Sequence, residues 1–199
     1  MIYVFIDYYN TLLIFAEWNE IDGDMNTQSD NTFLAEQSIP PHIDTYTKVS
    51  DYVLVSNYHN EKEREENIRL ARFLGEKTRE VVYVLPHIQP TLENADKLRK
   101  ALLPLNVKKN KNPDFYYRGR FVDGKTLTIE ELKEANRAKR SIQKKIKLGL
   151  KQADDVLLEV PESYPLDWIN NAVQGEINSL SHKHIVYIKH GCELLVFHK

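Results

Sequence analysis

The spacing of apolar and polar residues predicts short buried strands and amphipathic helices along most of the chain. Apolar runs at residues 2–6, 52–55 and 81–85 are typical of buried strands. Apolar residues at three- and four-residue spacing predict helices over residues 61–75 and 92–103, the first ending near a glycine and the second before a proline. The regular part of the chain therefore begins with a helix, a strand and a second helix.

A hairpin and a long helix are predicted next. Two short strands, residues 114–117 and 120–125, flank Arg118-Gly119, which suits a tight turn. Thr128 can cap a long basic helix that runs to about Lys151. A strand, a helix and a terminal hairpin follow at residues 156–160, 165–180 and 185–197. This order predicts an α/β protein with a mixed β-sheet flanked by helices.

The beginning of the chain does not share this regular pattern. After the first strand, residues 19–32 are polar and show no period, and Pro40-Pro41 marks an extended segment. We therefore predict two parts: an acidic N-terminal extension or subdomain over residues 1–57, and a domain over residues 58–199.

Composition excludes several classes of protein. Of the 199 residues, 42% are hydrophobic, which is enough for a core and too many for general disorder. No apolar run reaches the roughly 18 residues of a membrane span, and the start lacks the features of a signal peptide. A single cysteine, Cys192, excludes an intramolecular disulfide and a cysteine-rich zinc site. These features predict a cytoplasmic protein without a membrane partner.

The net charge of −2 conceals a separation of charge along the sequence. Residues 108–151 contain fourteen Lys or Arg and five Asp or Glu, whereas residues 1–50 contain eight acidic residues and Lys48 alone. A local basic block of this kind indicates a nucleic-acid partner. A well-solvated surface helix is the alternative reading, and the acidic N-terminal region is a candidate surface for a protein partner.

The predicted hairpin brings two carboxylates together. A two-residue turn at Arg118-Gly119 places Asp114 directly across from Asp123, and Lys125 lies on the same face. Opposed carboxylates repel each other unless a cation lies between them. A hard cation held by carboxylates, with a lysine nearby, is what a phosphodiester hydrolase dependent on Mg²⁺ (or Mn²⁺) needs.

A third carboxylate could come from the predicted helix at residues 61–75. On a helical wheel, Glu63 and Asn67 fall inside the apolar arc, and Glu66 lies at its edge. An inward glutamate needs a partner, and a metal ion would supply one. The other reading is that a helix end tolerates such a residue near solvent.

Pro113-Asp114, followed after eight residues by Asp123-Gly124-Lys125, resembles the motif of the PD-(D/E)XK nuclease superfamily. The core of that superfamily is α-β-β-β-α-β, and the motif here falls on the second and third of those strands. Residues 63–85 and 152–158 are further similar to the C-terminal tRNase domains of contact-dependent growth-inhibition toxins, whose relatives also occur as stand-alone proteins on bacterial mobile elements. The resemblance covers residues 61–199.

The resemblance implies a function and a set of site residues. Asp114, Asp123 and Lys125 would be catalytic together with Glu63 or Glu66, and Asp114, Asp123 and Glu63 would bind the metal ion. Asn67 is an alternative occupant of the position of the helix glutamate, and the second carboxylate is Asp rather than the commoner Glu. The implied function is a metal-dependent nuclease that acts on RNA, tRNA-like by resemblance, in preference to DNA.

The basic block supplies candidate contacts to nucleic acid. Its long stripe of charges at helical spacing is suited to following phosphates. In the resemblance this helix lies beside the active site. The candidate residues are Lys133, Arg137, Arg140, Lys144, Lys147, Lys151 and Gln152.

Two alternative functions stay open. A protein with this fold could bind nucleic acid or a protein partner without cleaving. The first strand with its terminal Asp7 also resembles the opening strand of NYN/PIN-type ribonucleases, which place a metal-binding Asp at that point.

Overall fold

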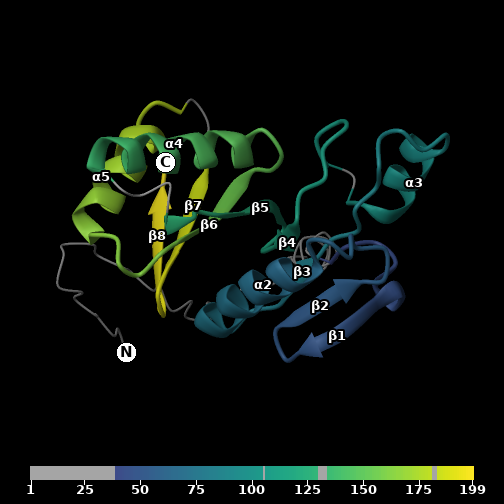
Figure 1. The fold of residues 1–199 in the computed structure, drawn as a ribbon. Coiled ribbons are helices and arrows are strands. Elements are labelled where there is room, and N and C mark those ends of the chain that lie inside the picture. The colour runs from purple at the N-terminus through teal and green to yellow at the C-terminus, as the bar shows by residue number, and fades with distance from the viewer. Residues whose placement is uncertain (1–38, 105, 130–133, 181–182) are drawn as a thin grey trace, which may run out of the picture. The chain divides into compact units, whose positions relative to one another are not determined.

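The computed structural model describes residues 39–104, 106–129, 134–180 and 183–199 (Figure 1). They belong to one compact unit, Leu34–Lys199. The predicted first strand, Asp7 and Lys133 lie outside the described residues.

The unit contains one mixed sheet whose eight strands lie side by side in chain order. β1 and β2 are antiparallel, β2 and β3 are parallel, and β3, β4 and β5 form an antiparallel meander. β5, β6 and β7 are parallel, and β8 closes the edge as an antiparallel hairpin with β7. The strands are β1 (Tyr46–Ser50), β2 (Val53–Ser56), β3 (Val82–Val84), β4 (Phe115–Tyr117), β5 (Arg120–Thr126), β6 (Asp155–Val160), β7 (Ile185–His190) and β8 (Glu193–His198).

Four α-helices of the described residues accompany the sheet: α2 (Arg64–Thr78), α3 (Ala95–Leu102), α4 (Ala135–Leu150) and α5 (Leu166–Ile177). A short 3₁₀ turn, Ile43–Thr45, precedes β1. The order of elements after residue 61 is the predicted one, and the predicted α/β class with a mixed sheet is confirmed. None of the helices within the described ranges is long and apolar enough to cross a membrane.

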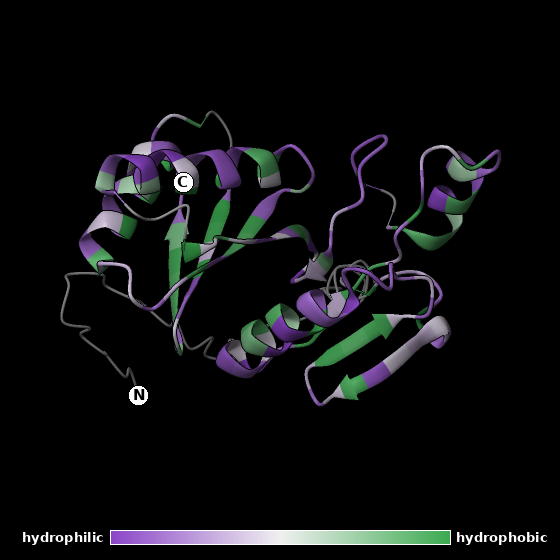
Figure 2. Ribbon diagram, viewed as in Figure 1, coloured by the Kyte–Doolittle hydropathy of each residue, from purple (hydrophilic) through white to green (hydrophobic). Residues whose placement is uncertain are grey.

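Successive residues of the central strands pack on opposite faces of the sheet, as the two-residue period of a strand requires. On one face, α2 packs through Leu70 and Leu74 against Leu157 and its neighbours. On the other, α4 and α5 cover Val156 and Leu158. In Figure 2, β2 is largely apolar whereas β1 is mostly hydrophilic, and the helices carry both apolar and polar residues. A third cluster, between the segment that carries α3 and the β4–β5 hairpin, contains Leu85, Leu103, Tyr116 and Phe121.

Several predicted helix ends were wrong: α2 and α3 begin three residues later than predicted, and α5 ends at Ile177 rather than at residue 180. α2 continues past Gly75 to Thr78, and Arg79 ends it in the left-handed conformation, with φ 61°. Gly75 instead allows close packing, because a Cβ atom there would lie 2.6 Å from the Cβ of Tyr52. The basic helix begins at Ala135 rather than at Thr128.

β1 was not predicted, because no residue of this edge strand is fully buried and its apolar residues do not alternate clearly. β1 and β2 both precede the predicted domain boundary at residue 57, yet β2 pairs with β3 in the common sheet. The strands from residue 46 onward therefore contribute to the sheet that carries the candidate site.

Candidate functional site

The β4–β5 hairpin has the predicted register. Arg118 and Gly119 have φ angles of 51° and 73°, which is typical of the two-residue turns that match strand twist. Tyr117 pairs with Arg120, and the ladder continues for two further pairs before it ends. The ladder ends at Phe115 and Val122, so Asp114 and Asp123 come directly after its last pair.

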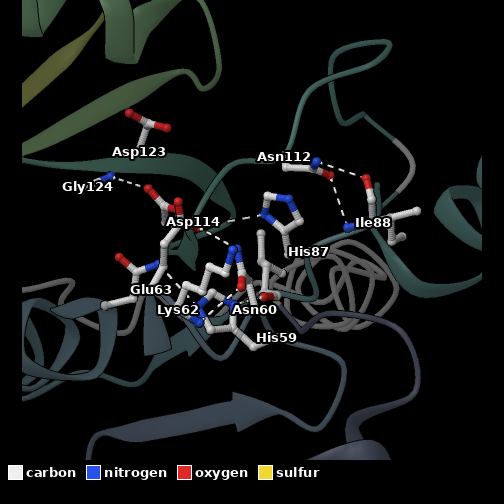
Figure 3. A network of polar contacts seen from close by, with 12 residues as sticks. His59, Asn60, Lys62, Glu63, His87, Ile88, Asn112, Asp114, Asp123 and Gly124 are labelled. Carbon is white, nitrogen blue, oxygen red and sulfur yellow. Dashed lines mark hydrogen bonds and ion pairs between the residues drawn. The ribbon is translucent and has the colours of Figure 1, made fainter. Parts of the chain in front are cut away.

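Asp114 lies one residue before β4, where the two strands separate. Its Oδ2 accepts a hydrogen bond of 2.7 Å from the backbone N–H of Gly124, so a side chain replaces a strand carbonyl as the partner of β5. Its Oδ1 accepts a second bond, of 3.2 Å, from Nδ2 of Asn67 on α2. Figure 3 shows this carboxylate between Gly124 and the residues that precede α2. Both oxygens are therefore fixed by neutral donors.

Asp123 is buried, with 2% of its surface exposed. Its Oδ2 forms an ion pair with the ammonium of Lys125. Lys125 also donates a bond of 2.9 Å to the carbonyl of Gly124. Burial and the charge of Asp114 raise the pKa of Asp123 to about 7, although Lys125 acts in the opposite direction.

The pKa of Asp114 is also raised. Burial is the main cause and the charge of Glu63 adds to it, whereas Lys125 and the N–H of Gly124 favour the ionised form. The two aspartates thus form a pair of neighbouring carboxylates that resist joint ionisation.

Asn67, rather than a glutamate, is the residue of α2 that reaches this pair. It is buried, and its amide lies 3.2 Å from Nε2 of His59 as well as from Asp114. Nδ1 of His59 lies 2.6 Å from the carbonyl of Leu85, which can only accept, so Nδ1 carries the proton and Nε2 accepts from Asn67. Burial lowers the pKa of His59, which favours this neutral form.

The two candidate helix glutamates are paired with other residues. Glu63 precedes the first residue of α2, its side chain is half exposed, and it pairs with His87 at 3.8 Å (Figure 3). Glu66 accepts a bond of 2.5 Å from the hydroxyl of Thr126, farther along β5. Within the described part of the chain, no three Asp, Glu, His or Cys side chains are grouped to hold a metal ion together. The predicted set of three carboxylates is therefore not assembled, because α2 begins after Glu63 and presents Asn67.

The end of α4 covers Asp123. Gly149 lies so close to β6 and to the site that a Cβ atom there would be 2.5 Å from Val156 and 3.2 Å from Oδ2 of Asp123. Lys108 donates to the carbonyl of Leu150 at 2.9 Å and so binds the last turn of the helix. The C-terminal end of this helix therefore lies beside Asp123.

The basic stripe of α4 faces away from the aspartates. Ile142 and Ile146 are buried on the sheet side of the helix, whereas Arg140 and Lys144 are exposed on the opposite side. About 10 Å of helix separates the two sides. The stripe therefore lies on the solvent side of α4 and does not line the site.

The other predicted nucleic-acid contacts have different surroundings. Arg137 joins Arg140 and Lys144 around a hollow of about 360 Å³. Lys147 is paired with the buried Glu176 of α5 at 3.2 Å, so part of its charge is neutralised within the fold. Lys151 and Gln152 lie in the turn after α4, where Lys151 is exposed and Gln152 is half-buried.

Sequence reasoning missed two polar residues that position the site, His59 and Asn112. The side chain of Asn112 bonds to the backbone carbonyl of Ile88 at 2.9 Å and accepts a bond of 2.8 Å from the buried Arg99. These bonds fix the segment before Asp114 to the segment after β3. No pattern in the sequence signals either residue, because each acts through partners that are distant along the chain.

The chain matches no model of a known protein family, and no curated protein or solved structure is significantly similar to it. Its chemistry is therefore inferred from the site alone: two neighbouring carboxylates, an ammonium in contact with one of them, and an amide that binds the other.

Proposed function

We propose that the chain is a metal-dependent nuclease of the PD-(D/E)XK type that hydrolyses phosphodiester bonds, with RNA favoured over DNA. The observation that carries this proposal is the pair of Asp114 and Asp123 at the point where β4 and β5 separate, with Lys125 in contact with Asp123. The order α2-β3-β4-β5-α4-β6 supports it, because it repeats the superfamily's core with α3 inserted before β4.

The two aspartates fit a hard divalent cation. Asp123 is buried and Asp114 is half-buried, and burial raises the pKa of each carboxyl above its usual value. Carboxylate oxygens are the ligands that Mg²⁺ and Mn²⁺ prefer. When bound, the cation would supply Lewis-acid stabilisation of negative charge on a phosphate.

The remaining residues orient the substrate and the carboxylates. Asn67 and the N–H of Gly124 hold both oxygens of Asp114 in place, so that this group is positioned before any ligand arrives. Lys125 leaves 27% of its side chain exposed, so its ammonium can turn from Asp123 toward the phosphate and stabilise the charge that develops there. Arg137, Arg140 and Lys144, on the side of α4 that faces away from the aspartates, provide an exposed basic surface for a part of the nucleic-acid backbone that lies outside the site.

A second candidate function is nucleic-acid binding without cleavage. The observation that favours it is Asn67, an amide in the place where the resemblance implies a helix glutamate. With two carboxylates instead of three, the site would bind a cation more weakly.

A cleavage assay tests the proposal. The full chain is incubated with end-labelled single-stranded RNA and DNA in Mg²⁺, in Mn²⁺ and in EDTA. We expect cleavage only with a divalent cation, and a loss of at least about 100-fold in Asp123→Asn and in Lys125→Met. Asp51→Asn, an exposed aspartate of the β1–β2 turn, is the matched control and should cleave like the wild type.

Cleavage that is equal in the site variants and the control would reject the assignment. Binding that persists in both site variants, with no cleavage at any cation concentration, would favour the second function. Binding through the basic stripe is measured separately, as the slope of log K against log salt concentration. Arg140→Gln and Lys144→Gln should each reduce this slope by about 0.7, the value for one phosphate of a single strand.

A further inference from the structure

An apolar cavity of about 430 Å³ lies beside the candidate site. Leu92 and Leu98, from the segment that carries α3, and Tyr58, from the segment after β2, contribute to its wall. These side chains are 47%, 38% and 54% exposed, respectively. Three large apolar side chains left open around one cavity indicate a binding site rather than an incomplete core.

The polar part of the cavity wall is shared with the site. His59 lines the cavity and bonds through Asn67 to Asp114. His87 lines it as well, and its ring pairs with Glu63. Figure 3 shows both imidazoles next to Asp114. A chain of contacts through two side chains, His59 and Asn67, would therefore connect a ligand in the cavity to the aspartates that bind the phosphate.

We infer that this cavity receives one unpaired nucleobase of the strand whose phosphate is bound at Asp114 and Asp123, so that the substrate is single-stranded or looped nucleic acid. The inference rests on the proposed function. A nucleobase has apolar faces and a polar edge, which match the leucines and the imidazole of His87. The rings of Tyr58 and His87 offer surfaces for stacking, and a paired base inside a duplex could not reach them.

The connection to the aspartates favours this occupant. An apolar segment of a partner protein would use the leucines but would have no need of a neighbouring pair of carboxylates. A nucleotide strand uses both, because one nucleotide can place its base in the cavity while an adjacent phosphate reaches the carboxylates.

The test uses the full chain and a single-stranded RNA of about twelve nucleotides in which each position in turn is made abasic. We expect one position next to the cleaved bond at which loss of the base lowers kcat/KM by about ten-fold or more, the size of a lost stacking contact. A duplex of the same sequence should be cleaved at least about ten-fold more slowly.

A cavity-filling variant links this effect to the cavity. Ala101→Trp, at an exposed position of α3 that lines the cavity, should lower kcat/KM for the intact strand about ten-fold and abolish the penalty of the abasic position. Leu166→Trp, at an exposed leucine of α5, is the matched control and should behave like the wild type. Leu98→Ser provides a second cavity variant, and thermal melting confirms that each variant is folded.

Two results would overturn the inference while leaving the proposed function intact: equal cleavage of all abasic strands, or equal cleavage by Ala101→Trp and Leu166→Trp. A binding measurement separates the two proposals if no cleavage is found. Asp123→Asn is mixed with strands that carry 2-aminopurine at one position, and a fluorescence change that Ala101→Trp removes supports the cavity without the nuclease. If no 2-aminopurine strand shows a fluorescence change, the inference is rejected. Occupation of the cavity by an apolar peptide alone would reject it as well.

Discussion

Replacement of Asp123 by Asn is predicted to stabilise the folded chain at neutral and alkaline pH while it removes the proposed activity. Asp123 is almost fully buried, and its contact with Lys125 does not compensate for the loss of water and the nearby charge of Asp114. An amide of the same shape avoids the buried negative charge. The site would thus be maintained at the expense of stability, as is common for functional residues.

The magnitude follows from the pKa. The pKa of Asp123 is raised from 3.8 to about 7, and one pKa unit corresponds to ~1.36 kcal/mol, so ionisation in the folded state costs about 4 kcal/mol. Between these two pH values the folded chain keeps a proton that the unfolded chain has released. The contribution of Asp123 therefore lowers the free energy of unfolding progressively from pH 4 to pH 7, and the loss is complete above pH 7.

The assay is urea unfolding of wild type and Asp123→Asn at pH 4 and at pH 8, without divalent cations. We expect similar stabilities at pH 4 and an advantage of about 2–4 kcal/mol for the variant at pH 8. Asp155 is a matched buried control, because it accepts bonds of 2.6 and 2.7 Å from the guanidinium of Arg120. Asp155→Asn should destabilise the fold by about 2 kcal/mol or more. If Asp123→Asn were also destabilised at pH 8, the reasoning about the carboxylate pair would be refuted.

Two further substitutions test the surroundings of the site. Asn67→Asp removes the donor to Asp114 and adds a third carboxylate. Without a cation, this variant should lower the free energy of unfolding by about 2 kcal/mol. Added Mn²⁺ should then raise the free energy of unfolding more in the variant than in the wild type. An equal response to Mn²⁺ in urea unfolding would contradict this. Gly149→Ala, whose Cβ would lie 2.5 Å from Val156, should destabilise the fold by about 1–3 kcal/mol despite the better helix propensity of Ala. Gly175→Ala in α5, where the nearest atom would be 3.3 Å away, is the control and should be neutral or stabilising in the same melts.

The hairpin at the centre of the site could be predicted because its register depends on local chemistry. A two-residue turn requires positive φ angles, which Gly119 adopts without strain and which the structure shows at Arg118 too. Once the turn is fixed, strand alternation determines that Asp114 and Asp123 are opposed.

The residue that α2 presents to the site could not be predicted in the same way. A helical wheel shows which face is apolar, and Glu63 and Asn67 both fall on it, but the first helical residue decides which of them can point inward. That residue is Arg64, which leaves Glu63 outside the helix. The contact between Asn67 and His59 depends on where α2 lies relative to β3, which is a property of the packed fold.

The most direct test of the central claim, that Asp114 and Asp123 together bind a divalent cation, is a titration of the full chain with Mn²⁺ at pH 8, followed by electron paramagnetic resonance of the free ion. The account predicts one site per chain that Mg²⁺ displaces, that is lost in Asp114→Asn and in Asp123→Asn, and that Asp51→Asn retains. Binding that survives in both site variants, or no binding up to millimolar Mn²⁺, would contradict it.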